Sequence, residues 1–352
     1  MTRSIPPSPE RARGSVDDLP GGEYRAITCR ARGMDGDTPA TVQSMSVVIC
    51  AYTVRRWEDL CRAVDSVLAD SDERLDVIVV VDHCDELHRL AKDRFDGLER
   101  VVVCRNDHAR GLSGARNSGV AMATGDVVAF VDDDAAVEPG WARMLMAHYA
   151  DHRVVAVGGH ATPVWPDERP GWMPREFDWV VGCSYVGQPT EVTTVRNPLG
   201  CNMSIRRDVL SRIGGFRSEV GRVGTRPVGG EETELFIRLS GRMPAGRVLL
   251  EPRAAVRHYV SRDRTTVRYF VRRCYYEGVS KAVVTELADR RGSLNSERDY
   301  SLRVLPRAVV RESVSLSPEG WSRASMVVVG LVVTAAGYVR GKVSRGFGAA
   351  DS

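Results

Sequence analysis

The sequence predicts an α/β protein in which a nucleotide-binding type of sheet is followed by a helical C-terminal part. Two observations predict this class. Apolar, strand-like runs alternate with helix-like segments between residues 46 and 131, and the last of these runs ends abruptly in Asp132, Asp133 and Asp134. Because the runs are continuously apolar rather than alternating, they indicate strands that are buried on both faces, as in a parallel sheet.

Length and composition agree with a single large domain or two smaller ones. The chain has 352 residues, of which 43% are hydrophobic and 27% are charged. The formal net charge is only +3, but the part after Arg253 is rich in arginine, which suits a phosphate-bearing or membrane-surface partner better than a nucleic acid. None of the eight cysteines forms a C-x-x-C pair, so we expect thiols in a reducing, cytoplasmic compartment.

The elements are expected in a regular order. Residues 1–43 have scattered proline, glycine and arginine without apolar periodicity, which predicts a flexible leader, and no signal-peptide pattern is visible. Strands are expected at residues 46–51, 75–81, 100–104 and 127–131, and helices at residues 57–69, 85–95 and, after a glycine-rich entry, 111–123. Two strands separated by a helix make a right-handed βαβ unit, so these strands predict one parallel sheet.

Ligands of open α/β sheets collect beyond the carboxyl ends of the strands, where the three aspartates lie. Adjacent carboxylates repel one another unless a cation or donor groups balance them. A divalent metal that carries phosphate oxygens is the simplest partner, because hard cations prefer carboxylate oxygen. The triad alone leaves an alternative equally open, namely an Asp-rich turn that opens a helix at Pro139 and supplies its caps.

Several motifs follow one another in an order that is specific in combination. They are S-V-V-I-C-A-Y at residues 46–52, V-V-V-D at 79–82, G-L-S-G-A-R-N-S-G at 111–119, A-F-V-D-D-D at 129–134, N-P-L-G-C-N-M-S-I-R-R at 197–207, I-G-G-F at 213–216, G-G-E-E-T-E-L at 229–235 and His258. In these motifs the chain resembles the family 2 glycosyltransferases, and the likeness covers residues 46–287.

The resemblance implies an inverting enzyme with a GT-A fold, whose core is a Rossmann-like nucleotide-binding sheet, and which uses a nucleotide-sugar donor. Residues 44–135 would form the nucleotide-sugar-binding half and residues 136–260 the acceptor-binding and catalytic half. Residues 261–352 would form a C-terminal helical, membrane-proximal extension.

For the donor, the resemblance implies that Ala51 and Tyr52 hold the base and that Asp82 reads uracil. Asp82 could equally be a helix cap. Arg116 would supply a guanidinium fork for phosphate or for the acidic cluster, although a structural pairing with a nearby aspartate is compatible with the same sequence.

The resemblance gives the acidic triad separate roles. Asp132 would bind the ribose, Asp133 would support it, and Asp134 would hold Mg²⁺ or Mn²⁺ that bridges the two phosphates. His258 would be a further metal ligand. A histidine after an apolar run is otherwise more often structural.

Inverting transfer needs one base that removes the proton of the acceptor hydroxyl. In the family pattern this base is Glu232, with Glu231 beside it. Crowded carboxylates at a helix start repel one another, and one of their pKa values is expected to rise toward neutrality. The alternative is the acidic first turn of a solvated helix.

The residues that bind the acceptor are the hardest to assign from the sequence. Trp172 and Trp179 belong to an aromatic, proline-rich stretch that suits sugar stacking but also suits a packed core, and Asn202 is a further candidate. A glycan, lipid-linked or part of a cell-surface polysaccharide, is the expected acceptor. An amphipathic basic helix at residues 262–287 suits a membrane face or an anionic acceptor, and an ordinary solvated helix that packs on the catalytic domain fits it equally well. The fourteen-residue apolar stretch at 326–339 falls short of the roughly 20 residues that span a bilayer, so we expect a packed or interfacial helix with peripheral contact at the inner face of the cell membrane.

Two other functions are weighed against the glycosyltransferase. A sugar-nucleotide pyrophosphorylase shares the nucleotide-binding architecture, but it needs a glycine-rich basic loop after the first strand, and residues 52–57 (Y-T-V-R-R-W) lack those glycines. A non-catalytic carbohydrate-binding relative is disfavoured, because the aspartate triad, the glutamate cluster and His258 are all present.

Overall fold

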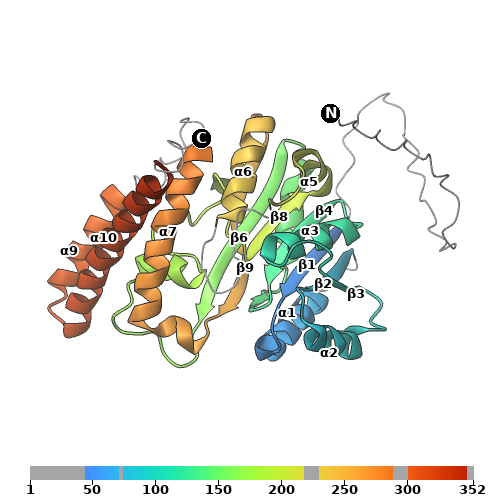
Figure 1. Cartoon of the computed structure of the whole chain (residues 1–352), viewed down its shortest axis with the longest axis horizontal. Helices are drawn as coiled ribbons and strands as arrows, with labels where there is room; N and C mark the ends of the chain where they lie inside the picture. The colour runs from blue at the N-terminus through green and yellow to red at the C-terminus, as the bar shows by residue number, and fades with distance from the viewer. Residues whose placement is uncertain (1–43, 71–73, 218–229, 288–299, 347–352) are drawn as a thin grey trace, which may run out of the picture. The chain divides into compact units, whose positions relative to one another are not determined.

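A computed structural model describes residues 44–70, 74–217, 230–287 and 300–346 (Figure 1). The predicted leader, residues 1–43, lies outside the described residues. A nine-stranded mixed sheet runs through this part of the chain in the order β3-β2-β1-β4-β8-β6-β9-β5, with the short β7 paired to β9. The predicted α/β class is therefore confirmed.

The first half of the sheet is parallel, as the buried apolar runs predict. Its strands are β1 (Met45–Ala51), β2 (Leu75–Val81), β3 (Val101–Arg105) and β4 (Val127–Asp132). The connecting helices are α1 (Trp57–Ala69), α2 (Asp85–Phe95) and α3 (Leu112–Met122). The strand order reverses between β1 and β4, which makes the gap between their carboxyl ends the expected ligand position.

The second half of the sheet is mixed, and its strands were not predicted. It contains β5 (Ala135–Val137), β6 (Val154–Val164), β7 (Thr193–Thr194), β8 (Asn202–Arg206) and β9 (Arg247–Tyr259). Strand β8 is antiparallel to β4 and β6, whereas β6 and β9 are parallel. The antiparallel pairing of β5 with β9 sets Ala135 opposite His258, so this register brings the histidine to the acidic turn.

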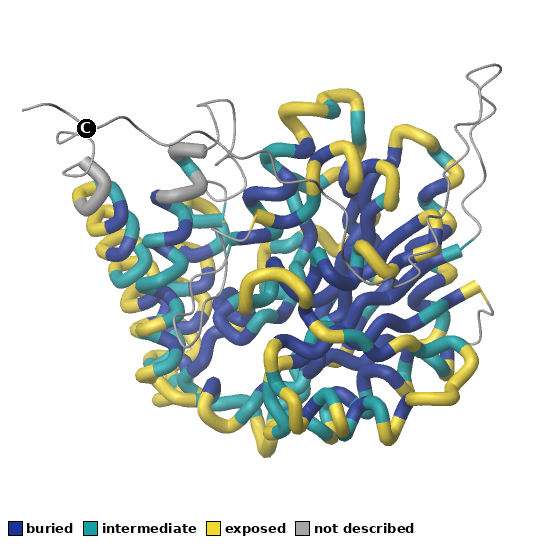
Figure 2. The backbone as a smooth tube through the Cα atoms, turned by 45° about the vertical axis from the view of Figure 1, so that its right-hand side comes forward, coloured by how far each residue is buried: buried dark blue, intermediate teal, exposed yellow. Residues whose placement is uncertain are grey.

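Helices cover both faces of the sheet, and the buried positions gather along its strands (Figure 2). Helices α1, α2 and α4 (Trp141–Ala147) contribute to the apolar cluster on one face. Helices α3, α5 (Arg207–Ile213) and α6 (Glu231–Arg242) contribute to the cluster on the other face. The two clusters account for the alternation of strands and helices that the sequence shows.

The C-terminal part is helical, as predicted. After the 3-10 turn η4 (Arg262–Thr265) come α7 (Val267–Leu287), the short π-helix η5 (Tyr300–Val304), α9 (Leu305–Val314) and α10 (Pro318–Gly346). With the 3-10 segment η3 (Arg175–Val181), they enclose a third apolar cluster. Glycines allow α7 and α10 to approach closely, since a Cβ at Gly337 would lie 2.0 Å from the Tyr275 carbonyl oxygen.

Helix α10 is longer than the fourteen-residue apolar stretch seen in the sequence. Residues Pro318–Val343 form one helical segment of 26 residues that is long and apolar enough to cross a membrane, and 28% of its most apolar window is buried. The folded helix thus exceeds the length of the apolar stretch, because it continues beyond that stretch on both sides. Helix α10 packs against α7 and α9 (Figure 1). Only part of its surface is buried.

Candidate functional site

The acidic triad lies in a turn between two strands. Asp132 ends β4, Asp133 and Asp134 form the turn, and β5 begins at Ala135. The alternative prediction of an Asp-rich turn is thus correct for the backbone, but the three aspartates do not cap the following helix. Asp70 does so, accepting hydrogen bonds from the backbone N–H groups of Gly140 (3.0 Å) and Ala142 (2.9 Å).

Two arginines neutralise the buried part of the triad. An Nη atom of Arg56 lies 2.8 Å from a carboxylate oxygen of Asp133 and 3.0 Å from one of Asp134. Arg264 lies 3.4 Å from the same Asp134 oxygen. Burial raises the pKa of Asp133, and the charge of Arg56 opposes this rise. Arg56 was not predicted from the sequence, although its place in the loop between β1 and α1 was a usable signal.

Three side chains converge as possible metal ligands. One ligand atom each from Asp132, Asp134 and His258 lies within 4.8 Å of the others. The His258 Nε2 atom is 3.2 Å from Asp134. Among the described residues, the buried Nδ1 of His258 and one oxygen of Asp133 have no hydrogen-bond partner. Carboxylate oxygens with one imidazole nitrogen suit Mg²⁺ or Mn²⁺, so this arrangement fits a divalent cation.

The predicted base-binding residues differ in accessibility. Tyr52 exposes 56% of its surface beside the end of β1, where its ring can meet a ligand. The Ala51 side chain is buried in the core, and only its backbone is available at the edge of the sheet. Asp82 lies at the end of β2 with most of its side chain buried.

Asp82 organises the loop that precedes α3, and its contacts do not cap α2, the helix that follows it, so the capping alternative does not hold. Its carboxylate accepts hydrogen bonds from the backbone N–H of Gly111 (3.0 Å) and from the side chain of Asn106 (2.7 Å), and it contacts His83 at 2.8 Å. Asn106 in turn accepts a hydrogen bond from Ser118 (2.9 Å). Sequence analysis missed Asn106, which follows β3 just as Asp82 follows β2. These contacts fix the carboxylate at the ligand edge of the sheet.

Arg116 connects the acidic turn to the glutamate cluster. It is buried on α3, and its guanidinium lies 3.5 Å from both Asp132 and Glu231. It also donates a hydrogen bond to the Gly200 carbonyl (3.0 Å). Burial lowers the pKa of Arg116, but the two carboxylates outweigh burial and keep its pKa above the ordinary value. Both roles foreseen for this arginine, pairing with an aspartate and facing a ligand site, are therefore compatible with its position.

The three glutamates at the start of α6 have different surroundings. Glu231 is buried beside Arg116. Glu234 forms an ion pair with Arg238 (2.6 Å) and a longer one with Arg217 (3.3 Å). Glu232 lines the pocket, and burial together with the charge of Glu231 raises its pKa from 4.5 to about 7. The alternative of a solvated acidic turn is therefore wrong, because Glu231 and Glu234 are buried and ion-paired.

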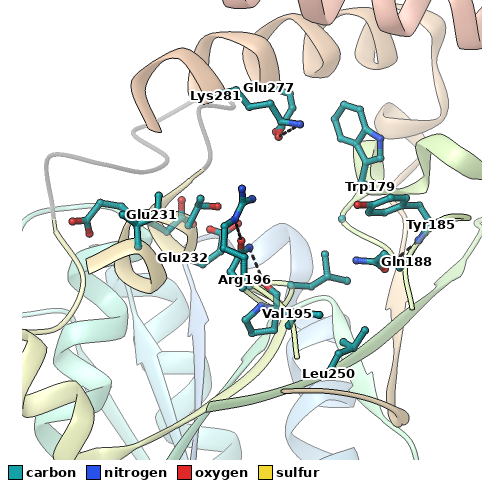
Figure 3. Close-up of a pocket in the computed structure, with 18 of the residues that line it drawn as sticks. Trp179, Tyr185, Gln188, Val195, Arg196, Glu231, Glu232, Leu250, Glu277 and Lys281 are labelled. Atoms are coloured by element: carbon teal, nitrogen blue, oxygen red, sulfur yellow. Dashed lines mark hydrogen bonds and ion pairs between the residues drawn. The ribbon is translucent and has the colours of Figure 1, made fainter. Parts of the chain in front are cut away.

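A large pocket of about 1330 Å³ joins Asp132 and Arg116 to the glutamates and to the C-terminal helices. In Figure 3, Glu231, Glu232 and Arg196 lie on one side of it, Trp179, Tyr185 and Gln188 lie on the other, and Glu277 and Lys281 project from α7. Glu277 pairs with Arg273 (2.9 Å) and with Lys281 (3.8 Å). The pocket can hold a ligand that reaches from the acidic turn to α7.

Of the three predicted acceptor residues, only Trp179 lies at the pocket. Trp179 lines the pocket, and its indole N–H donates a hydrogen bond to the Tyr300 hydroxyl (3.2 Å). Trp172 instead packs edge-on against Phe270 in the third apolar cluster. Asn202 is fully buried and engaged with Trp141 and two backbone carbonyls, which gives it a structural place rather than one at the pocket.

Comparisons with known proteins agree with this architecture. In the solved structure of a mannosyltransferase from Pyrobaculum calidifontis with GDP-Man and Mn²⁺, the fold matches with a TM-score of 0.56 at 16% identity, over 84% of this chain and 86% of that chain. The structure of GalNAc-T7 with UDP, GalNAc and Mn²⁺ matches with a TM-score of 0.50 at 18% identity, over 74% of this chain and 54% of that one. The fold is thus the GT-A fold of glycosyltransferases.

Sequence similarity identifies the family. The family model for glycosyl transferase family 2 matches residues 46–214. A glucosyl-dolichyl phosphate glucuronosyltransferase from Haloferax volcanii is 38% identical over 241 residues, which cover 68% of this chain and 77% of that protein. The chain belongs to the family 2 glycosyltransferases, and it is an enzyme of the glycosyltransferase type. The expected family is therefore confirmed, and neither the pyrophosphorylase nor the non-catalytic alternative holds.

Proposed function

We propose that this protein is a metal-dependent inverting glycosyltransferase that moves a sugar from a UDP-sugar to a hydroxyl group of a lipid-linked glycan, with Glu232 as the base. The observation that carries this proposal is the position and pKa of Glu232. Its carboxylate lines the pocket that also contains Asp132, and its pKa is raised to about 7. A base with a pKa near the working pH accepts a proton most effectively.

Glu231 is the neighbouring candidate, but its surroundings suit a different role. It is buried and lies 3.5 Å from Arg116, so its negative charge is balanced inside the protein. We infer that Glu231 holds Arg116 in place and that Glu232 accepts the proton of the acceptor hydroxyl. No ion pair of 4.0 Å or less joins Glu232 to another described side chain, which leaves its carboxylate available to the pocket.

For the donor, we propose that the uracil ring lies against Tyr52 and that Asp82 accepts a hydrogen bond from its N–H group. The exposed tyrosine ring supports stacking. The contacts with Gly111, Asn106 and His83 hold the Asp82 carboxylate in place, and the oxygen bound to Gly111 can still accept a further hydrogen bond. Asp132 is the proposed ribose ligand, because it is the most exposed aspartate of the triad.

Asp134 and His258 are the proposed metal ligands. When it is bound, a divalent cation supplies positive charge that stabilises the departing nucleoside diphosphate. The convergence of ligand atoms at the acidic turn supports this assignment, and Asp133 supports the turn through its ion pair with Arg56. The Mn²⁺ bound in two structures of similar fold is consistent with it.

We propose that the acceptor carries a lipid and that the enzyme acts at the inner face of the cell membrane. The Haloferax volcanii relative is a glucosyl-dolichyl phosphate glucuronosyltransferase, which supports such an acceptor. Helices α9 and α10 line the pocket with Leu305, Leu331 and Thr334. The same helices expose large apolar side chains to solvent: Val310, Val314, Trp321, Val328, Val332 and Val339. A lipid in the pocket would thus lie close to a surface suited to a bilayer.

Paired substitutions test the proposed base. Glu232→Gln should bind UDP-sugar with Mn²⁺ as wild type does but lose transfer by about a thousandfold, since the proton acceptor is gone. Glu231→Gln should fold less stably yet keep measurable transfer. Binding by calorimetry and transfer to a lipid-linked acceptor are the measurements. If Glu231→Gln is inactive and Glu232→Gln is active, the base is Glu231.

The membrane contact has its own test. Val328→Ser combined with Val332→Ser should reduce co-sedimentation with phosphatidylglycerol vesicles, because both valines are exposed on α10. Val102→Ser is the control. This valine is similarly exposed, but it lies on the edge strand β3 and not on α10. Equal sedimentation of all variants would contradict contact through α10.

A further inference from the structure

We propose that Arg56 is an exchangeable counter-cation: without donor it neutralises Asp133 and Asp134, and when a divalent cation and a nucleoside diphosphate bind, its guanidinium moves from the carboxylates to the diphosphate. This inference rests on the proposed function, because it takes Asp134 as a metal ligand. It adds a residue that controls both metal and donor binding.

Arg56 already occupies the place of a cation at the acidic turn. One Nη atom contacts both Asp133 (2.8 Å) and Asp134 (3.0 Å), so a single positive charge is shared between two buried carboxylates. Asp134 also belongs to the convergent group of possible metal ligands. A dication beside Asp134 would face the positive charge of Arg56 at close range, and the two cations would repel each other. Arg56 and a metal ion therefore compete for this carboxylate.

Arg56 is freer to move than Arg264, the other cation at Asp134, because its side chain is more exposed, although both residues lie on short 3-10 turns. Arg56 belongs to the short turn η1 (Val54–Arg56), and its side chain is 19% exposed. Arg264, by contrast, exposes only 9% of its side chain and lies farther from Asp134, at 3.4 Å. A partly exposed side chain on a short turn can change its rotamer without disturbing the sheet.

The diphosphate of a bound donor would lie within reach of the Arg56 guanidinium. The guanidinium of Arg56 lies 5.8 Å from the centre of the Tyr52 ring, the proposed platform for the base. A nucleoside diphosphate with its base at Tyr52 and its ribose at Asp132 would carry its diphosphate onward from the ribose toward Asp134, where Arg56 lies. The planar guanidinium fork matches phosphate oxygens, so a released Arg56 gains a new anionic partner. The incoming dication would replace the charge of Arg56 beside Asp134, and the released arginine would balance the diphosphate.

The test is a comparison of two binding constants in the full-length protein. Arg56→Gln should bind Mn²⁺ alone about tenfold more tightly than wild type, since the competing charge is removed. The same variant should bind UDP in saturating Mn²⁺ about tenfold more weakly, because the phosphate partner is removed. Mn²⁺ binding is measured by electron paramagnetic resonance, and UDP binding by calorimetry, with GDP in parallel.

Arg55→Gln is the matched control. Arg55 is exposed on the same turn, and its loss removes the same charge one residue away. Both of its binding constants should stay within about twofold of wild type, as expected for an exposed charge. Thermal unfolding provides a further readout: Mn²⁺ should raise the melting temperature of Arg56→Gln more than that of wild type. Arg56→Lys covers the case in which the glutamine variant does not fold, and it should keep wild-type Mn²⁺ affinity but bind UDP more weakly.

The two opposite shifts distinguish this inference from the proposed function. If Mn²⁺ binds Arg56→Gln no more tightly than wild type, or if UDP binding is unchanged, the exchange is excluded while the metal site remains. If neither wild type nor any variant binds Mn²⁺ at millimolar concentration, the metal assignment fails, and this inference fails with it.

Discussion

Two acidic clusters, one at the turn after β4 and one at the start of α6, contain similar side chains but are neutralised differently. At the turn after β4, Asp133 and Asp134 are buried and share the charges of Arg56 and Arg264. At the start of α6, Glu231 and Glu234 also have arginine partners, but Glu232 lines the pocket with a raised pKa. The first cluster is built to hold positive charge, whereas the second leaves one carboxylate able to take up a proton.

Arg116 lies between the clusters and belongs to both. Its contacts with Asp132 and Glu231 have the same length, 3.5 Å, so neither cluster holds the guanidinium alone. This difference in charge balance supports the proposal that the aspartates act as ligands and that Glu232 acts as the base.

Removal of Asp134 should have the largest effect. Asp134→Ala should lower transfer by about a thousandfold or more, since loss of the metal-bound charge removes several kcal/mol of transition-state stabilisation. Mn²⁺ affinity should fall in parallel, and both are measured on the same preparation. Substantial transfer in this variant with added Mn²⁺ would mean that Asp134 is not a metal ligand.

Removal of the shared arginine should weaken the fold. Arg116→Met leaves Glu231 and Asp132 without their common cation in a buried place, and we expect a loss of about 3–5 kcal/mol in the free energy of unfolding. Urea denaturation measures it. The matched control is Arg89→Met, which changes an exposed arginine on α2 and should stay within about 0.5 kcal/mol of wild type. A similarly small change for Arg116→Met would show that the clusters do not depend on it.

The base should be visible in the pH dependence of transfer. Because the pKa of Glu232 is about 7 and the base must be ionised, kcat/KM should rise about tenfold per pH unit below this value and level off above it. The profile is measured at saturating Mn²⁺ between pH 5.5 and pH 8.5, a range chosen to bracket about one and a half units on each side. A flat profile across this range would exclude Glu232 as the base.

The smallest expected effect is on stability. A carboxyl group whose pKa is raised on folding stabilises the folded state below its unfolded pKa of about 4.5, and this contribution is lost as the pH rises through about 7. Glu232→Gln should therefore be more stable than wild type at pH 8 by about 1–2 kcal/mol, after allowance for its partial exposure. At pH 5 the two proteins should melt at nearly the same temperature. The opposite order at pH 8 would mean that the pKa of Glu232 is not raised.

The first four strands and three helices could be predicted to within about one residue. Each has a strong local signal: a short, continuous apolar run for a buried strand, or apolar spacing of three and four residues for a helix. The strands of the second half lack this signal. Strand β6 contains Gly158 and Gly159, and β9 carries charged residues and Pro252 along its thirteen residues. Their pairing with distant strands stabilises them, and the sequence does not display that pairing.

The site residues also divide into those with a local sequence signal and those without one. The sequence identified the acidic triad, Arg116, Glu232 and His258 from local motifs and family order. It also proposed Trp172 and Asn202, which the structure places against Phe270 and in the buried core. Aromatic and amide side chains serve a core and a binding site equally well, so composition could not separate the two.

The sequence by itself determined the family, the parallel half of the sheet and the residue types of the site, because these depend on local patterns of apolar and charged residues. Only the tertiary structure decided which basic side chains pair with which carboxylates. Arg56 and Arg264 reach the acidic turn from distant parts of the chain, and the register of β9 on β5 brings His258 to Asp134. Charge balance depends on distances of a few ångströms between such segments, which sequence order does not specify.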